Sequence, residues 1–162
     1  MVQPEENEFL AQLEGKGKRP IHFFRMMAHR PEVLKAFVPL YGAIMGAGPV
    51  DRRTKELVYL TCSYANACAY CMVAHVASSK KAGVTEAEQS ALQAGRDEEF
   101  PPAERAAIAY ARDLTQTGSA ARTRATLKAH FSDEQIVELT LVASMANFTN
   151  RFNNGLGVMP EV

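Results

Sequence analysis

Two cysteines three positions apart, Cys68 and Cys71, are the residues in this 162-residue chain best suited to covalent chemistry. On a helix this spacing places the two side chains about one turn apart, close enough to form a disulfide bond. They fall near the expected start of a helix, where the helix dipole stabilises a thiolate. A thiolate can attack a peroxide or a disulfide, and the nearby thiol can resolve the product as an intramolecular disulfide. The pair therefore predicts redox chemistry.

His75 lies four positions after Cys71, so we expect both side chains on one helical face. An imidazole titrates near neutral pH and can take the thiol proton or return a proton to a leaving group. Because of this spacing we assign Cys71 as the attacking thiol and Cys68 as the resolving thiol. Glu56, on the preceding predicted helix, would orient the imidazole if the fold brings the two together. The sequence alone does not place Glu56 beside His75.

Metal binding is the main alternative interpretation of these residues. Cys62 joins the Cys-x-x-Cys pair and His75 as a possible fourth zinc ligand. Structural zinc sites usually collect their ligands from loops or separate elements, whereas these four residues lie on two consecutive helical segments. We therefore expect no metal and no cofactor, and we expect Cys62 to be a small core residue.

The elements that must position these residues are all predicted to be helices. Apolar residues recur at helical spacing, and no stretch alternates apolar and polar residues as a half-buried strand would. Asp51 is an expected N-cap, Thr85 and Ser132 open capping boxes, and Gly83 is expected to end the cysteine helix. The fold class is therefore all-α, with about seven helices. They cover residues 21–28, 32–45, 52–65, 66–82, 85–94, 101–114 and 132–152.

Length and composition favour one globular domain over residues 1–162, with residues 1–20 and 95–99 as candidates for mobile segments. Apolar residues make up 47% of the chain. Three cysteines are too few for an extracellular disulfide framework, and no signal peptide or membrane span is visible, so we expect a cytoplasmic protein. The 18 basic and 18 acidic side chains cancel, which removes the main electrostatic drive for binding nucleic acid.

The combination of Glu56, Cys68-Ala-Tyr-Cys71 and His75 resembles the signature of the carboxymuconolactone decarboxylase/alkylhydroperoxidase D-like (AhpD-like) superfamily. The resemblance extends over about two thirds of the chain, to its asparagine-rich C-terminal part. It implies an all-helical homo-oligomer, a trimer or a hexamer, that acts as a thiol-dependent peroxidase or disulfide reductase. It also implies a hydroperoxide substrate and a dithiol electron donor, either a lipoyl protein or a thioredoxin-like protein.

One position departs from the peroxidase branch of this superfamily. That branch usually has histidine just before the second cysteine, where this chain has Tyr70. Two alternatives to a peroxidase stay open. One is a lyase like the decarboxylase branch, which lacks the cysteine pair, and the other is a non-enzymatic, redox-responsive interaction protein.

The predicted N-terminal helices carry more apolar side chains than one core of this size is expected to need. Their positions spread around more than one helical face. Large exposed apolar patches are uncommon on monomers, so we expect a homo-oligomer with these helices at its contacts. The residues are Phe23, Phe24, Met26, Met27, Phe37, Leu40 and Met45.

Overall fold

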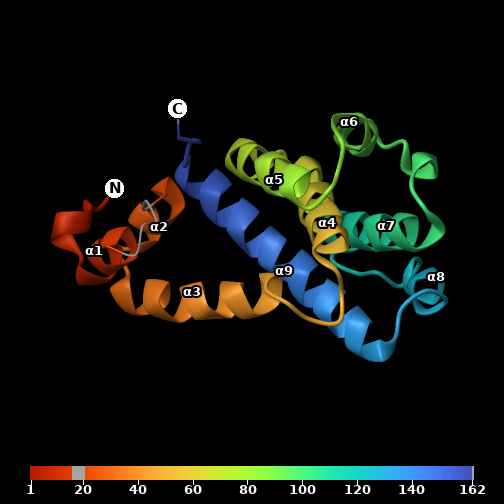
Figure 1. Ribbon diagram of the computed structural model, residues 1–162, viewed down its shortest axis with the longest axis horizontal. Coiled ribbons are helices and arrows are strands. Elements are labelled where there is room, and N and C mark those ends of the chain that lie inside the picture. The colour runs from red at the N-terminus through yellow and green to blue at the C-terminus, as the bar shows by residue number, and fades with distance from the viewer. Residues whose placement is uncertain (16–20, 162) are drawn as a thin grey trace.

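The computed structural model describes residues 1–15 and 21–161, and over these residues it is entirely helical, without strands (Figure 1). None of the described helices is long and apolar enough to span a membrane. Two short 3₁₀ helices, η1 (Pro4–Glu6) and η2 (Asp97–Glu99), accompany the α-helices. The α-helices are α1 (Glu8–Gly15), α2 (His22–Met27), α3 (Pro31–Met45), α4 (Arg52–Ala65), α5 (Ala69–Lys81), α6 (Glu86–Ala94), α7 (Pro102–Thr117), α8 (Arg124–Lys128) and α9 (Asp133–Leu156).

Helix α4 is the centre of the structure, and it contacts α5, α6, α7 and α9. Ten consecutive residues of α4, Thr54 to Ser63, are buried, including the polar ones. Figure 1 shows α9 running across the molecule, with α3 along one side of it and α4 and α5 along the other. Helix α5, which follows the first cysteine, therefore packs against both α4 and α9.

The four predicted caps all lie at helix ends. The Asp51 side chain accepts a hydrogen bond from the backbone N–H of Thr54, and both Thr85 and Ser132 form complete capping boxes. Gly83 follows α5 with a φ of 86°, in the left-handed region that favours glycine. These local signals depend only on residues within one turn, which is why the sequence locates them well.

The start of the cysteine helix differs from the prediction. The sequence suggested one helix over residues 66–82, whereas α4 ends at Ala65 and α5 begins at Ala69. Between them Ala67 adopts a φ of 49°, and the N–H of Cys68 closes the end of α4 on the carbonyl of Ser63 at 3.0 Å. The chain changes direction here, so Cys68 precedes the first residue of α5 and is not part of the helix.

Two helices were missed, which raises the predicted seven to nine in the described part of the chain. α8 has only five residues, too few for a periodic pattern. α1 falls in the segment 1–20 that was a candidate for mobility, yet Leu10 is fully buried in the core. Residues 16–20 of that segment lie outside the described residues.

The argument from surplus apolar side chains in the N-terminal helices was wrong. Phe23 and Phe37 are buried, and their rings pack edge to face with centroids 5.1 Å apart. Phe23 also packs against Phe152 near the end of α9, at 5.3 Å. The N-terminal helices therefore fold back on the core of the same chain, and of the seven residues only Leu40 is largely exposed. A homo-oligomer remains an expectation from the family resemblance.

A buried ion pair fixes the turn between α3 and α4 onto α9. Lys55 is fully buried, and its Nζ lies 2.6 Å from Oε1 of Glu138. The other Glu138 oxygen accepts the N–H of Val50 at 2.7 Å, and Nζ also donates to the carbonyls of Ile44 and Gly46. Such complete pairing is what allows a lysine to be buried in its charged form.

Gly48 lies in the same turn, where a Cβ would be 2.0 Å from Oε1 of Glu138. Only glycine allows the backbone to come this close to the carboxylate. The turn therefore holds the start of α4, and with it Glu56, in a fixed position relative to α9.

Candidate active site

The two cysteines of the Cys-x-x-Cys motif are free thiols in contact with each other. The Cys68 Sγ and Cys71 Sγ atoms lie 2.8 Å apart, and both residues are buried. Cys68 is the N-cap of α5, and its sulfur also accepts the backbone N–H of Cys71 at 3.4 Å. The two sulfurs are thus positioned to form a disulfide with little movement of the backbone.

The surroundings of the two thiols shift their pKa values in opposite directions. The hydrogen bond from the Cys68 thiol lowers the pKa of Cys71 to about 7, and the amide of Asn153 acts in the same direction against the opposing effect of burial. The same contact with Cys71, together with burial, raises the pKa of Cys68. These opposite shifts favour ionisation of Cys71 before Cys68.

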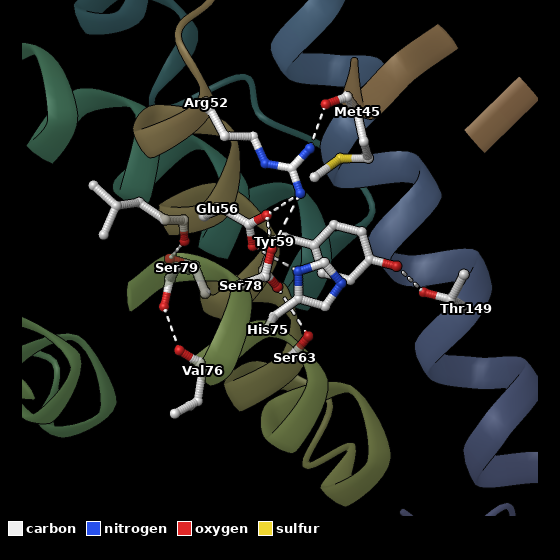
Figure 2. A network of polar contacts seen from close by, with 12 residues as sticks. Met45, Arg52, Glu56, Tyr59, Ser63, His75, Val76, Ser78, Ser79 and Thr149 are labelled. Carbon is white, nitrogen blue, oxygen red and sulfur yellow. Dashed lines mark hydrogen bonds and ion pairs between the residues drawn. The ribbon is translucent and has the colours of Figure 1, made fainter. Parts of the chain in front are cut away.

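Glu56 and His75, from α4 and α5, lie side by side (Figure 2). Nδ1 of His75 is 2.7 Å from Oε2 of Glu56. The other carboxylate oxygen accepts a hydrogen bond from Ser78 at 2.6 Å and pairs with Arg52 at 2.5 Å. Burial opposes ionisation of Glu56, but these bonds and charges, led by His75, hold the pKa of its carboxyl below the usual value. The structure thus brings together the two residues that the sequence could not place.

The Glu56 contact determines which imidazole nitrogen faces the cavity as a base. An ionised carboxylate can only accept, so Nδ1 of His75 carries a hydrogen and Nε2 is the ring nitrogen left facing the cavity. Nε2 lies 3.4 Å from the hydroxyl of Tyr41, whose pKa burial raises to about 12. Tyr59 stacks on the imidazole with ring centroids 3.5 Å apart, so the ring cannot turn freely.

A cavity of about 100 Å³ lies between the Cys71 thiol and the His75 imidazole. Cys71 and His75 both line it, although no hydrogen bond connects His75 to either thiol among the described residues. The described part of the structure therefore shows no direct contact for the proton transfer that the spacing of Cys71 and His75 predicted. Aromatic side chains from α2, α3 and α4 form much of the remaining wall: Phe23, Phe24, Phe37, Tyr41 and Tyr59.

Tyr70, the position that departs from the peroxidase branch, also lines this cavity. Its hydroxyl donates to Oε1 of Glu161 at 3.1 Å and accepts the N–H of Phe23 at 3.4 Å. Burial raises its pKa, so the phenol stays protonated. Tyr70 therefore connects the cavity wall to α2 and to the C-terminal segment of the chain.

Cys62 is separated from this site, as predicted for a core residue. It is fully buried, it accepts a hydrogen bond from Thr115 at 3.2 Å, and burial raises its pKa to about 12. Over residues 1–15 and 21–161, no group of three or more His, Cys, Asp or Glu side chains is arranged to hold a metal ion.

One residue in contact with the thiols was not singled out by the sequence, which allowed the asparagines of residues 147–154 to line the active site, cap helices or form subunit contacts. Asn153 of α9 donates from Nδ2 to Cys71 Sγ at 3.2 Å. Its only sequence signal was membership of this asparagine-rich stretch.

Comparison with known proteins identifies the family. The model of the carboxymuconolactone decarboxylase family matches residues 31–113, more than half of the chain, and this range contains all four predicted site residues. The chain belongs to that family. The uncharacterized protein YdfG of Bacillus subtilis is 30% identical over 112 residues, which cover 67% of this chain and 76% of YdfG.

Solved structures confirm the AhpD-like helical fold. An uncharacterized peroxidase-related protein from a Silicibacter species superimposes with a TM-score of 0.85 at 23% identity, over 99% of this chain and 87% of that one. An Agrobacterium tumefaciens protein of unknown function, a candidate antioxidant defence protein, has a TM-score of 0.76 at 29% identity, over 85% and 96%. The debrominase Bmp8 has a TM-score of 0.79 at 21% identity, over 95% and 84%. The fold thus occurs with more than one chemistry, and membership of the family supports an enzymatic role.

Proposed function

We propose that this protein is a thiol-dependent peroxidase and disulfide reductase that reduces alkyl hydroperoxides through the Cys68–Cys71 pair. The observation that carries the proposal is the contact of 2.8 Å between two free thiols, one of which has a pKa lowered to about 7 and lines an aromatic cavity. An apolar wall favours an alkyl or aryl hydroperoxide over hydrogen peroxide, because the organic group is removed from water when it binds.

In the oxidising half-reaction, the Cys71 thiolate attacks the terminal oxygen of the hydroperoxide. An S–O bond forms, the O–O bond breaks, and the alkoxide takes a proton and leaves as an alcohol. Cys71 is then a sulfenic acid, oxidised by two electrons. The Cys68 sulfur attacks the Cys71 sulfur, a disulfide forms, and the hydroxyl leaves as water with the Cys68 proton.

In the reducing half-reaction, a dithiol donor supplies two electrons and two protons. One donor thiolate attacks the disulfide, and its second thiol resolves the mixed disulfide and leaves the donor oxidised. Because both sulfurs are buried, a narrow dithiol such as a lipoyl arm fits the access better than the broad surface of a thioredoxin-like protein.

The Glu56–His75 pair manages the proton in this proposal. Nε2 takes the proton that Cys71 releases on ionising, through a molecule bound in the cavity, and the imidazolium then returns this proton to the leaving alkoxide. Glu56 touches neither sulfur in the described contacts. It acts through His75, by holding the ring orientation and stabilising its cation.

Steady-state consumption of cumene hydroperoxide with excess dihydrolipoamide tests the proposal. We expect many turnovers per subunit, with one alcohol formed for each dithiol oxidised. A redox-responsive interaction protein would oxidise once and stop. A lyase would leave the hydroperoxide untouched, and its activity on a lactone would survive replacement of both cysteines.

The variant His75→Ala is expected to lower the rate of peroxide reduction at pH 7 by about a hundredfold, the usual scale for losing a general acid–base. The defect should shrink as the pH rises above the Cys71 pKa of about 7, because hydroxide then supplies the thiolate. The measurement is the pH profile of single-turnover reduction by stopped flow. His130→Ala, at an exposed histidine, is the matched control. An equal defect at every pH would assign His75 a purely structural role.

A further inference from the structure

Asn153 contacts the Cys71 sulfur through its donor and has a buried acceptor without a partner in the described part of the chain. It is only 2% exposed and lines the cavity beside Cys71. Its Nδ2 donates to Cys71 Sγ at 3.2 Å. Its Oδ1 is, among the side-chain nitrogen and oxygen atoms of the described residues, the buried one without a hydrogen-bond partner. Nearly all buried polar atoms in folded proteins are paired, so an unpaired acceptor beside a reactive sulfur needs an explanation.

Two neighbouring asparagine side chains of α9 do find hydrogen-bond partners for their carbonyl oxygens. Asn66 donates to Oδ1 of both Asn147 and Asn150 at 3.0 Å. Asn150 then donates to Ser63, and Asn147 donates to Thr115. Asn153 lies on the same helix but contacts the cavity, and only its carbonyl oxygen is left without a donor.

The orientation of the Asn153 amide follows from the charge on Cys71. A thiolate is an acceptor, so the NH₂ group faces the sulfur and the carbonyl oxygen must point away from it. A neutral Cys71 thiol would instead favour the reverse orientation, with the amide oxygen accepting from S–H. The donor contact observed at 3.2 Å is therefore the one that a Cys71 thiolate requires.

We propose that Asn153 is a further catalytic residue: its N–H group holds the Cys71 sulfur as a thiolate, and its carbonyl oxygen accepts the O–H hydrogen of the bound hydroperoxide. This inference rests on the proposed peroxidase function. A hydroperoxide whose terminal O–H is bonded to Oδ1 has its terminal oxygen next to the attacking sulfur, with its organic group toward the aromatic wall.

The proposed contacts are consistent with the balanced reaction. As the S–O bond forms and the O–O bond breaks, the hydrogen stays on the terminal oxygen, which becomes the hydroxyl of the sulfenic acid. That hydroxyl keeps its bond to Oδ1 until Cys68 attacks the sulfur. The proton for the alkoxide comes from His75, so Asn153 transfers no proton itself.

Asn153 is uncharged, and it influences the pKa of Cys71 together with several titratable groups around the cavity. Cys68 gives the larger lowering of the thiol pKa, and the amide of Asn153 follows it. Removal of the amide should therefore raise the Cys71 pKa only in part. The other titratable groups around the cavity are His75 with its partner Glu56, and the phenols Tyr41, Tyr59 and Tyr70.

The proposal has a donor half, the N–H contact to the sulfur, and an acceptor half, the carbonyl contact to the hydroperoxide. The variant Asn153→Leu tests both, since leucine has nearly the same shape but neither donor nor acceptor. The first measurement is the pH dependence of iodoacetamide alkylation of reduced Cys71, with the modified residue identified by peptide mass spectrometry. Alkylation needs the thiolate but no bound hydroperoxide. We expect its midpoint to rise and the rate at pH 7 to fall about fivefold or more. An unchanged midpoint would overturn the donor half.

The second measurement is single-turnover reduction of cumene hydroperoxide by the same variant at about pH 10, where the thiol is ionised in both proteins. Alkylation should then match the wild type, while hydroperoxide reduction should stay about tenfold slower because the substrate has lost its acceptor. Recovery of the wild-type hydroperoxide rate would overturn the acceptor half. A wild-type protein that is alkylated with a lowered midpoint but never reduces hydroperoxide would refute the proposed function and the acceptor half, while leaving the donor half supported.

Thermal stability and a neighbouring variant provide further controls on the substitution of Asn153. At about pH 5, where Cys71 is protonated in both proteins, leucine only removes an unpaired buried acceptor, so the thermal midpoint of the reduced variant should not fall below that of the wild type. Asn154→Ala removes the neighbouring exposed amide, which donates to the carbonyl of Asn66 at 2.8 Å, and should leave both rates unchanged. If leucine prevents folding, Asn153→Asp replaces it. The added carboxylate should raise the alkylation midpoint further, and an unchanged midpoint there would overturn the donor half.

Discussion

Replacing Cys71 by serine is expected to abolish hydroperoxide reduction while leaving the helical fold intact. The serine hydroxyl remains protonated at neutral pH and cannot form a disulfide, so neither the attack nor the resolving step is possible. Serine retains the size and hydrogen-bonding capacity needed beside Cys68 and Asn153, which explains why the fold should tolerate it. The measurements are steady-state peroxide consumption and far-UV circular dichroism.

Cys62→Ala is the matched control for the loss of a buried thiol. Cys62 contacts Thr115 and lies outside the cavity, so this variant should keep its turnover even if its stability falls. Substantial peroxidase activity in folded Cys71→Ser would contradict the assignment of Cys71 as the attacking thiol.

The second large effect is expected at Cys68, where two substitutions separate its two roles. Both Cys68→Ala and Cys68→Ser remove the resolving thiol, so both should reduce hydroperoxide once and then stop as the Cys71 sulfenic acid. Only alanine also removes the hydrogen bond that gives the largest lowering of the Cys71 pKa. The single-turnover rate of Cys68→Ala at pH 7 should therefore fall about tenfold, and recover as the pH rises through the ordinary thiol range.

A sulfenic acid probe such as dimedone, read by mass spectrometry, reports the trapped intermediate in both variants. The pH profile of the first turnover reports the hydrogen bond. Continued turnover in either variant would show that Cys68 is not the resolving residue, and coincident pH profiles for alanine and serine would remove its role in stabilising the thiolate.

The features that the sequence predicted well are those encoded within one or two helical turns. The spacing of Cys68, Cys71 and His75 and the capping boxes at Thr85 and Ser132 require no knowledge of which helices meet. The reversal at Ala67 was hidden because a single left-handed alanine carries no compositional signal, unlike a glycine.

The remaining features depend on tertiary contacts. Glu56 meets His75 because α4 and α5 are adjacent, and Asn153 meets Cys71 across 82 positions of sequence. Helical periodicity describes one element at a time, so it cannot choose between a cap, a subunit contact and a cavity for an asparagine on α9. For the same reason it could not show that Phe23 and Phe37 pack on the core of their own chain.

The single proton held between Cys68 and Cys71 also links the stability of the reduced protein to pH. In the unfolded chain both thiols titrate near about 8.5. Between about pH 7 and 8.5, the folded protein has already released the Cys71 proton while the unfolded chain retains it, so stability rises with pH. The depressed pKa of Cys71 thus contributes its full stabilisation above the unfolded value, and this is lost as the pH falls through about 7.

Above about pH 8.5 the unfolded chain loses both protons, whereas the folded protein keeps the one on Cys68, whose pKa is raised. The folded state then binds more protons than the unfolded state, and stability falls again. The thiol contribution to the free energy of unfolding should therefore peak near pH 8.5 in urea titrations of the reduced protein, and this maximum should vanish in Cys71→Ser. Oxidation to the disulfide removes both titrating groups, so the reduced and oxidised forms differ in how their stability responds to alkali.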